Sequence, residues 1–187
     1  MFDQGLFFRQ LVTLRDGTRI LLRPLEKTDR QALIDLYASV TPEERLLMRH
    51  DVCDPKVIGG WVDQLDYKTV LPIVAVLGAR IVGNTSLHFF EGHKRHIGEV
   101  RSFLAGDFRR RGLGARSLQS VIELARKHGL YLLEVQLASD QTDYVKAFQN
   151  AGFVQKSNFE DYFIDLNGEL RDICFLMMRL RPSDDEY

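Results

Sequence analysis

Ala105-Gly106-Asp107-Phe108-Arg109-Arg110-Arg111-Gly112-Leu113-Gly114-Ala115 is the most informative segment of this chain. It follows a β-rich segment and leads into a helix that ends before Gly129. A helix start presents unpaired N–H groups and the positive end of the helix dipole. The two glycines let the backbone approach a ligand closely, and the three arginines add positive charge. The stretch therefore predicts a site for a pyrophosphate or another dense anion.

Two familiar nucleotide-binding loops do not fit this stretch. A Walker loop needs Gly-Lys-Ser or Gly-Lys-Thr after its glycines, and neither occurs here. A dinucleotide fingerprint needs a third glycine where Ser117 stands, and it belongs to a βαβ unit rather than to a meander. The other alternative is a solvated basic loop that only caps a helix. The order of strand, basic loop and helix favours the anion site.

Hydropathy patterns on both sides of the stretch predict a mixed sheet that is covered by helices. An Asp-Gly turn at residues 16–17 predicts a hairpin from Gln10 to Leu25. Cap residues and apolar spacing predict helices at 28–39, from 41, at 54–65, up to 127 and at 140–150. The predicted strands lie at 70–77, 80–90, 95–104, 131–137, 153–166 and 169–180.

Length and composition favour one soluble, cytoplasmic domain over residues 1–187. The chain is 45% hydrophobic and 27% charged, which excludes a disordered chain and a small disulfide scaffold. Its formal net charge of −1 argues against a nucleic-acid partner. Cys53 and Cys174 form no Cys-x-x-Cys pair, so no zinc knuckle or redox dithiol is expected. The longest aliphatic run, Val70 to Leu77, is far shorter than the ~20 residues that span a bilayer, so we expect no membrane partner.

The glycine stretch resembles a family signature. Arg109-x-x-Gly112-x-Gly114, between a strand and a helix, is similar to the Q/R-x-x-G-x-G/A motif of the GNAT (Gcn5-related) N-acetyltransferases. Ala151-Gly152-Phe153 resembles the late "GF" of that family, and the likeness extends over about residues 18–180. Within the family, Thr41 to Arg49, Arg80 to Gly83 and Gly98 to Val100 are most similar to the acyltransferase domain of bacterial Pat-type protein lysine acetyltransferases.

The resemblance implies an α/β fold of the GNAT type. This fold has a mostly antiparallel central sheet of about six to seven strands, flanked by helices and splayed between the fourth and fifth strands. It also implies acetyl-CoA as the co-substrate, an amine as the acceptor and no metal. The residues that it assigns to acetyl-CoA are Phe103, Leu104, Arg109, Arg110, Arg111, Gly112, Leu113, Gly114, Ala115, Gln141 and Phe148. Phe103 and Leu104 would offer backbone N–H groups to the pantetheine arm and the thioester carbonyl.

Glu99 is the candidate general base. It lies ten residues before Arg109, where the resemblance places a catalytic glutamate. The alternative is a strand-face carboxylate that pairs with Arg101 or Lys94, and His88 is the second choice of base.

The sequence departs from the family at the position of the usual acid. Many members carry a tyrosine four residues before the "GF" glycine, where this chain has Phe148. Tyr144 lies one helical turn earlier and would need another geometry. A CoA thiol is acidic enough for solvent to protonate it as it leaves, so we expect activity without this tyrosine.

Other interpretations stay open. His88, His93 and His96 suggest a metal site, but a surface cluster is favoured. The function is an acetyl-CoA-dependent N-acyltransferase or, alternatively, a non-catalytic acyl-CoA sensor. A nucleic-acid-binding interaction module is a third and weaker hypothesis. The acceptor is a protein lysine, a polyamine, an aminoglycoside or another small amine, and the resemblance leaves a homodimer open.

Overall fold

The computed structural model describes residues 8–180, which form a mixed α/β fold. The strands are β1 (Gln10–Thr13), β2 (Arg19–Pro24), β3 (Val70–Leu77), β4 (Arg80–Phe89), β5 (Ile97–Leu104), β6 (Leu132–Ala138), β7 (Val154–Ile164) and β8 (Leu170–Arg179). The helices are α1 (Arg30–Tyr37), α2 (Pro42–Leu46), α3 (Pro55–Asp63), α4 (Leu113–Lys127) and α5 (Thr142–Asn150). β3 has the predicted bounds, whereas β5 begins two residues late because Gly92–Lys94 forms a 3₁₀ turn before it.

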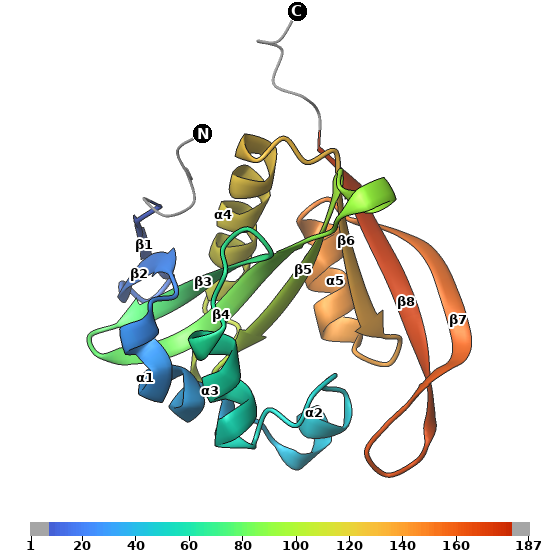
Figure 1. Ribbon diagram of the computed structural model, residues 1–187, viewed down its shortest axis with the longest axis horizontal. Coiled ribbons are helices and arrows are strands. Elements are labelled where there is room, and N and C mark those ends of the chain that lie inside the picture. Colours follow the sequence, from blue (N-terminus) through green and yellow to red (C-terminus); the bar gives the residue numbers. More distant parts are fainter. Residues whose placement is uncertain (1–7, 181–187) are drawn as a thin grey trace, which may run out of the picture.

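One sheet of eight strands runs through the described part of the molecule in the order β1-β2-β3-β4-β5-β6-β8-β7. All neighbours are antiparallel except β5 and β6, which are parallel. The predicted α/β class and the mostly antiparallel sheet are confirmed. The sheet has eight strands rather than six to seven because the hairpin of β1 and β2 adds a strand at one edge (Figure 1).

The predicted splay lies between β5 and β6. They pair at three positions only, from Ile97 opposite Leu132 to Glu99 opposite Glu134. Beyond Glu99, β5 continues beside β4 while β6 continues beside β8, so the two strands diverge. Counted along this chain the splay separates the fifth and sixth strands, because the N-terminal hairpin shifts the numbering by one.

Helices cover both faces of the sheet (Figure 1). The Phe103 ring stacks on Tyr37 of α1 with centroids 5.2 Å apart. The next side chain, Leu104, points to the start of α4, because a Cβ on Gly114 would lie 3.2 Å from it. Successive strand residues point to opposite faces, so α1 and α4 lie on opposite sides of β5.

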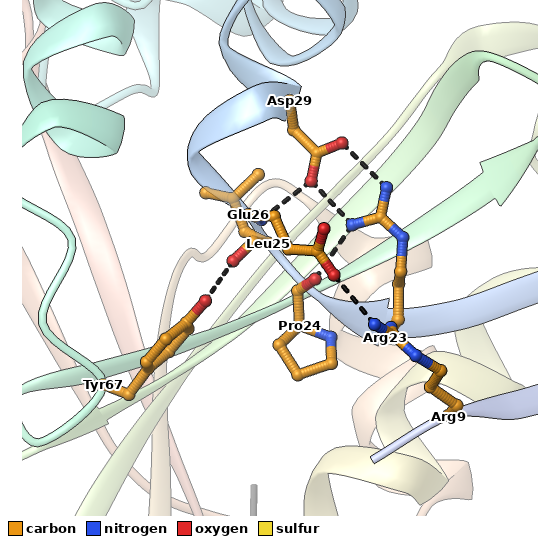
Figure 2. Close-up of polar contacts among 7 residues, drawn as sticks. All are labelled: Arg9, Arg23, Pro24, Leu25, Glu26, Asp29 and Tyr67. Atoms are coloured by element: carbon orange, nitrogen blue, oxygen red, sulfur yellow. Dashed lines mark hydrogen bonds and ion pairs between the residues drawn. The ribbon is translucent and has the colours of Figure 1, made fainter. Parts of the chain in front are cut away.

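Polar contacts fix the start of α1 against β2 (Figure 2). Arg23 on β2 donates two hydrogen bonds to Asp29, at 2.6 and 2.7 Å, and Asp29 also accepts the N–H of Glu26. The Tyr67 hydroxyl donates to the carbonyl of Leu25 at the end of β2. This network, in which a bidentate ion pair is the strongest element, holds α1 over the middle of the sheet.

No helix in the described part of the chain is both long enough and apolar enough to cross a membrane.

Candidate active site

The splay exposes one set of backbone groups and hides the other. The carbonyl of His96 accepts the N–H of Leu132 on β6, whereas the N–H of Ala105 donates to the carbonyl of Val82 on β4. Backbone groups alternate along a strand, so the Leu104 N–H faces the gap and the Phe103 N–H faces β4. Of the two amides expected to meet the thioester, the geometry offers that of Leu104. Phe103 contributes its ring instead.

A cavity of about 440 Å³ opens on the α1 side of the splay. Its floor carries a row of polar side chains on alternate residues of neighbouring strands, a pattern that is unusual for buried strands. The polar residues of this floor are Asn84, Ser86, His88, Arg101 and Gln136. Tyr37, Trp61 and Phe103 form an aromatic wall, in which Trp61 meets Tyr37 edge to face at 5.5 Å.

The glycine stretch forms the start of α4 as predicted. Gly112 is the N-cap with φ of +90°, a backbone conformation that favours glycine. The first bond of this turn is from the N–H of Arg116 to the carbonyl of Gly112 at 3.3 Å. The amides of Leu113, Gly114 and Ala115 therefore lie in the first turn, where a helix has no internal acceptors for them. A dense anion fits this turn because amides and dipole converge there.

The three arginines of the stretch each contact a carboxylate. Arg109 pairs with Glu44 of the α2 helix at 2.5 Å and donates to the carbonyl of Leu104 at 3.1 and 3.0 Å. Arg111 binds Asp16 and Thr18 in the hairpin of β1 and β2, so it anchors the loop to the sheet edge.

Arg110 differs from its two neighbours. Its side chain is 89% exposed, and it contacts Asp143 on α5 at 3.1 Å. Its φ of +57° lies in the left-handed region, which is strained for a residue with a Cβ. Of the three guanidinium groups, that of Arg110 has the weakest attachment to the protein.

Glu99 lies at the point where the strands part, with 2% of its surface exposed. Arg49 donates to Glu99 Oε1 at 2.5 Å, and Arg101 donates to Oε2 at 2.8 Å. Burial raises the pKa of Glu99, but the hydrogen bond from Arg101 and the charges of Arg101 and Arg49 outweigh it, so that the pKa lies below its usual value. The expected pairing with Arg101 is present. Lys94 makes no ion pair with Glu99 in the described part of the chain.

His88 lies opposite Glu99 on β4 and lines the cavity. Its Nε2 lies 2.9 Å from the Ser86 hydroxyl. Burial, followed by the charge of Arg101, lowers the pKa of His88 to about 4, so the ring is neutral at pH 7.

The α5 side of the cavity holds Phe148, which stands at the position of the usual tyrosine, together with two polar residues. Gln141, Tyr144 and Phe148 line it. Phe148 is buried and packs edge to face on Phe153 at 5.2 Å. Burial raises the pKa of Tyr144, and the charge of Arg109 counteracts that effect.

The three histidines do not gather into a metal site. His93 and His96 are exposed at the turn before β5, while His88 lines the cavity. No group of three metal-binding side chains is found among residues 8–180.

Sequence reasoning missed most groups that approach Glu99 and Arg109 from far along the chain. Arg49 is 50 residues from Glu99, and Gln136 lies on the neighbouring strand. Glu44 lies within the stretch that carries the Pat-type likeness, but nothing in the sequence indicates its contact with Arg109. Period-two alternation on β6 could have placed Gln136 on the Glu99 face, once the register was known.

The comparisons with known proteins agree with this geometry. Residues 30–153 match the model of the "Acetyltransferase (GNAT) family". The chain therefore belongs to this family of N-acetyltransferases. No match is found among the curated proteins.

Solved structures share the fold at low identity. The GNAT domain of S. lividans PAT superposes with a TM-score of 0.78 at 20% identity, over 92% of this chain and 97% of that one. yncA from Salmonella typhimurium, solved with its cofactor acetyl-CoA, gives a TM-score of 0.74 at 16% identity, over 90% and 99%. RimL, a ribosomal L7/L12 alpha-N-protein acetyltransferase in complex with coenzyme A, gives 0.80 at 13% identity, over 93% and 100%.

Proposed function

We propose that this protein transfers an acetyl group from acetyl-CoA to a primary amine by direct attack, and that the amine is a protein lysine. The observation that carries the proposal is the junction of two features: the open first turn of α4 and the splay that begins at Glu99. The lysine acceptor rests on the resemblance to Pat-type domains and on the similarity to the GNAT domain of S. lividans PAT.

The chain would hold the carrier along the splay. The amides of Leu113, Gly114 and Ala115 would bind the diphosphate, with Arg110 turning from Asp143 to add a charge. Acetyl-CoA, when bound, supplies the activated acetyl thioester. The Leu104 N–H would donate to the carbonyl oxygen as negative charge develops on it.

Glu99 would take the proton from the amine. A lysine-like amine has a pKa of about 10.4, so its deprotonation near pH 7 costs about 4–5 kcal/mol. The amine nitrogen then bonds to the carbonyl carbon as the bond from that carbon to sulfur breaks, and the nitrogen releases its second proton to solvent. Phe148 has no proton to give, so the departing thiolate would take one from solvent.

Replacing Glu99 by glutamine tests this role. We expect kcat/KM at pH 7 to fall about 10²-fold or more, with recovery at high pH as the amine deprotonates by itself. Acetyl-CoA affinity by calorimetry should be unchanged, and Glu123→Gln on the exposed face of α4 is the matched control. Undiminished turnover in Glu99→Gln would show that Glu99 is not the base.

The acceptor itself can be found with isotope-labelled acetyl-CoA and a mixed panel of amines and cell-extract proteins, read by mass spectrometry. Label on lysine side chains of proteins supports the proposal. Label only on small amines would contradict the protein acceptor while leaving the acetyl transfer intact.

A sensor of acyl-CoA is the second candidate. Two observations favour it: the clamping of Glu99 by two arginines and the absence of a hydroxyl at Phe148. Tight binding of CoA without acetylation of any amine in the panel would support the sensor.

A further inference from the structure

Two buried carboxylates lie side by side where β5 and β6 part. Glu99 and Glu134 are directly opposite each other in the parallel pair, so their side chains share one face. They are 2% and 4% exposed. A buried carboxylate is normally paired with a cation, because desolvation of its charge is costly.

The two carboxylates differ in their partners. Glu99 binds both Arg49 and Arg101. Glu134 accepts one long hydrogen bond, from Gln136 Nε2 at 3.4 Å, and makes no ion pair within residues 8–180. The second carboxylate therefore lacks the cation that its burial calls for.

Among residues 8–180, Arg49 is the one ion-pair partner of Glu99 that comes from outside the sheet. It follows α2 in a segment without regular structure, and 42% of its side chain is exposed. Its guanidinium bridges Glu99 and the Gln136 side-chain oxygen, the latter at 3.0 Å. The same amide of Gln136 reaches Glu134, so Arg49 lies across both strands of the splay.

Charge counting shows what Arg49 contributes. With Arg49 in place, the two guanidinium groups of Arg49 and Arg101 balance the two carboxylates. His88 adds no charge, because it is neutral at pH 7. Without Arg49, Arg101 alone faces Glu99 and Glu134, and one negative charge is left over. That charge matches a single ammonium group.

The cavity beside Arg49 has the properties of a binding site. Arg49, Arg101 and Gln136 line it. Asn84 lines it too, is 7% exposed, and has a side-chain oxygen without a hydrogen-bond partner in the described structure. An unsatisfied buried acceptor in a cavity indicates that a ligand or water completes it.

We propose that the place between Glu99, Glu134 and Gln136 is a binding site for a primary ammonium, and that Arg49 occupies it until the acceptor arrives. The inference rests on the proposed function and names how the acceptor is held. The incoming ammonium replaces the guanidinium, while Arg101 stays on Glu99. Glu134 attracts and positions the amine, and Arg49 is a competitor rather than a contact of the substrate.

The test uses n-butylamine, which carries a bare ammonium on an aliphatic stem, at saturating acetyl-CoA. Release of CoA thiol gives KM and kcat for wild type, Arg49→Gln and Glu134→Gln. Removal of the competitor should lower the KM for butylamine about tenfold, and loss of the Glu134 charge should raise it about tenfold. In both variants kcat should change less than KM.

Arg45→Gln is the matched control, because Arg45 lies four residues before Arg49, within α2, and pairs with Asp51 instead. Its KM should equal that of wild type. Arg49→Met, which keeps the aliphatic stem, serves if Arg49→Gln unfolds in a thermal melt. A higher KM in the Arg49 variants, or an unchanged KM in Glu134→Gln, would overturn the inference.

Calorimetry separates this inference from the proposed function. If wild type releases no CoA with any amine, butylammonium chloride is titrated into wild type and Arg49→Gln in the presence of CoA. Tighter binding to the variant supports the ammonium site without catalysis. Equal or no binding overturns the site.

Discussion

The partly buried ring of His88 should make folding sensitive to mild acid. His88 faces Arg101, Arg49 and Glu99, and its pKa in the folded chain is about 4 rather than 6.5. Between these two values the unfolded chain binds a proton that the folded chain rejects. The free energy of unfolding must therefore fall as the pH drops below about 6.5, and the fall ends near pH 4.

The size of the effect follows from the two pKa values. At pH 5 an unfolded histidine is about 97% protonated, whereas the folded one is protonated in about a tenth of the molecules. Expelling that proton on folding costs about 2 kcal/mol at pH 5 and close to nothing at pH 7.5.

Urea unfolding of wild type and His88→Gln at pH 7.5 and pH 5.0 measures this loss of stability. Glutamine can still hydrogen-bond to Ser86 but does not titrate, and every other group is common to both proteins. Between the two pH values, wild type should lose about 2 kcal/mol more than the variant. Equal losses, within about 0.5 kcal/mol, would refute the assignment of a neutral, partly buried His88.

Two further predictions concern the coenzyme loop. Gly112→Ala places a Cβ at φ of +90°, so the free energy of unfolding in urea should fall by about 1 kcal/mol and acetyl-CoA binding should weaken. Gly106→Ala is the control, because Gly106 has open space around it and no positive φ, and it should change neither quantity. Glu44→Gln keeps the capping hydrogen bond of α2 but removes the ion pair with Arg109, so calorimetry should find acetyl-CoA bound about threefold more tightly. Weaker binding would mean that Glu44 positions Arg109 for the coenzyme.

Local chemistry explains why so much of the fold could be predicted. Each of the following signals affects the backbone of only a few neighbouring residues: the Asp-Gly turn, the apolar run of β3, the proline at the start of α2 and Gly129 after α4. Gly112 and Gly114 placed the coenzyme loop for the same reason, because the start of a helix and a glycine φ are properties of adjacent residues.

The contacts of the site depended on which segments the fold brings together. No local pattern pairs Arg109 with Glu44 or Arg111 with Asp16, and the register of β5 decides that Leu104, not Phe103, turns its N–H into the gap.

Local sequence signals were enough to predict most elements, the family and the loop that begins α4. The contact of Arg49 with Glu99 and the burial of Glu134 beside it could be seen only after the chain had folded. Backbone preference and capping act between neighbouring residues, whereas the charge balance of a buried cluster is set by residues that meet only when the sheet forms.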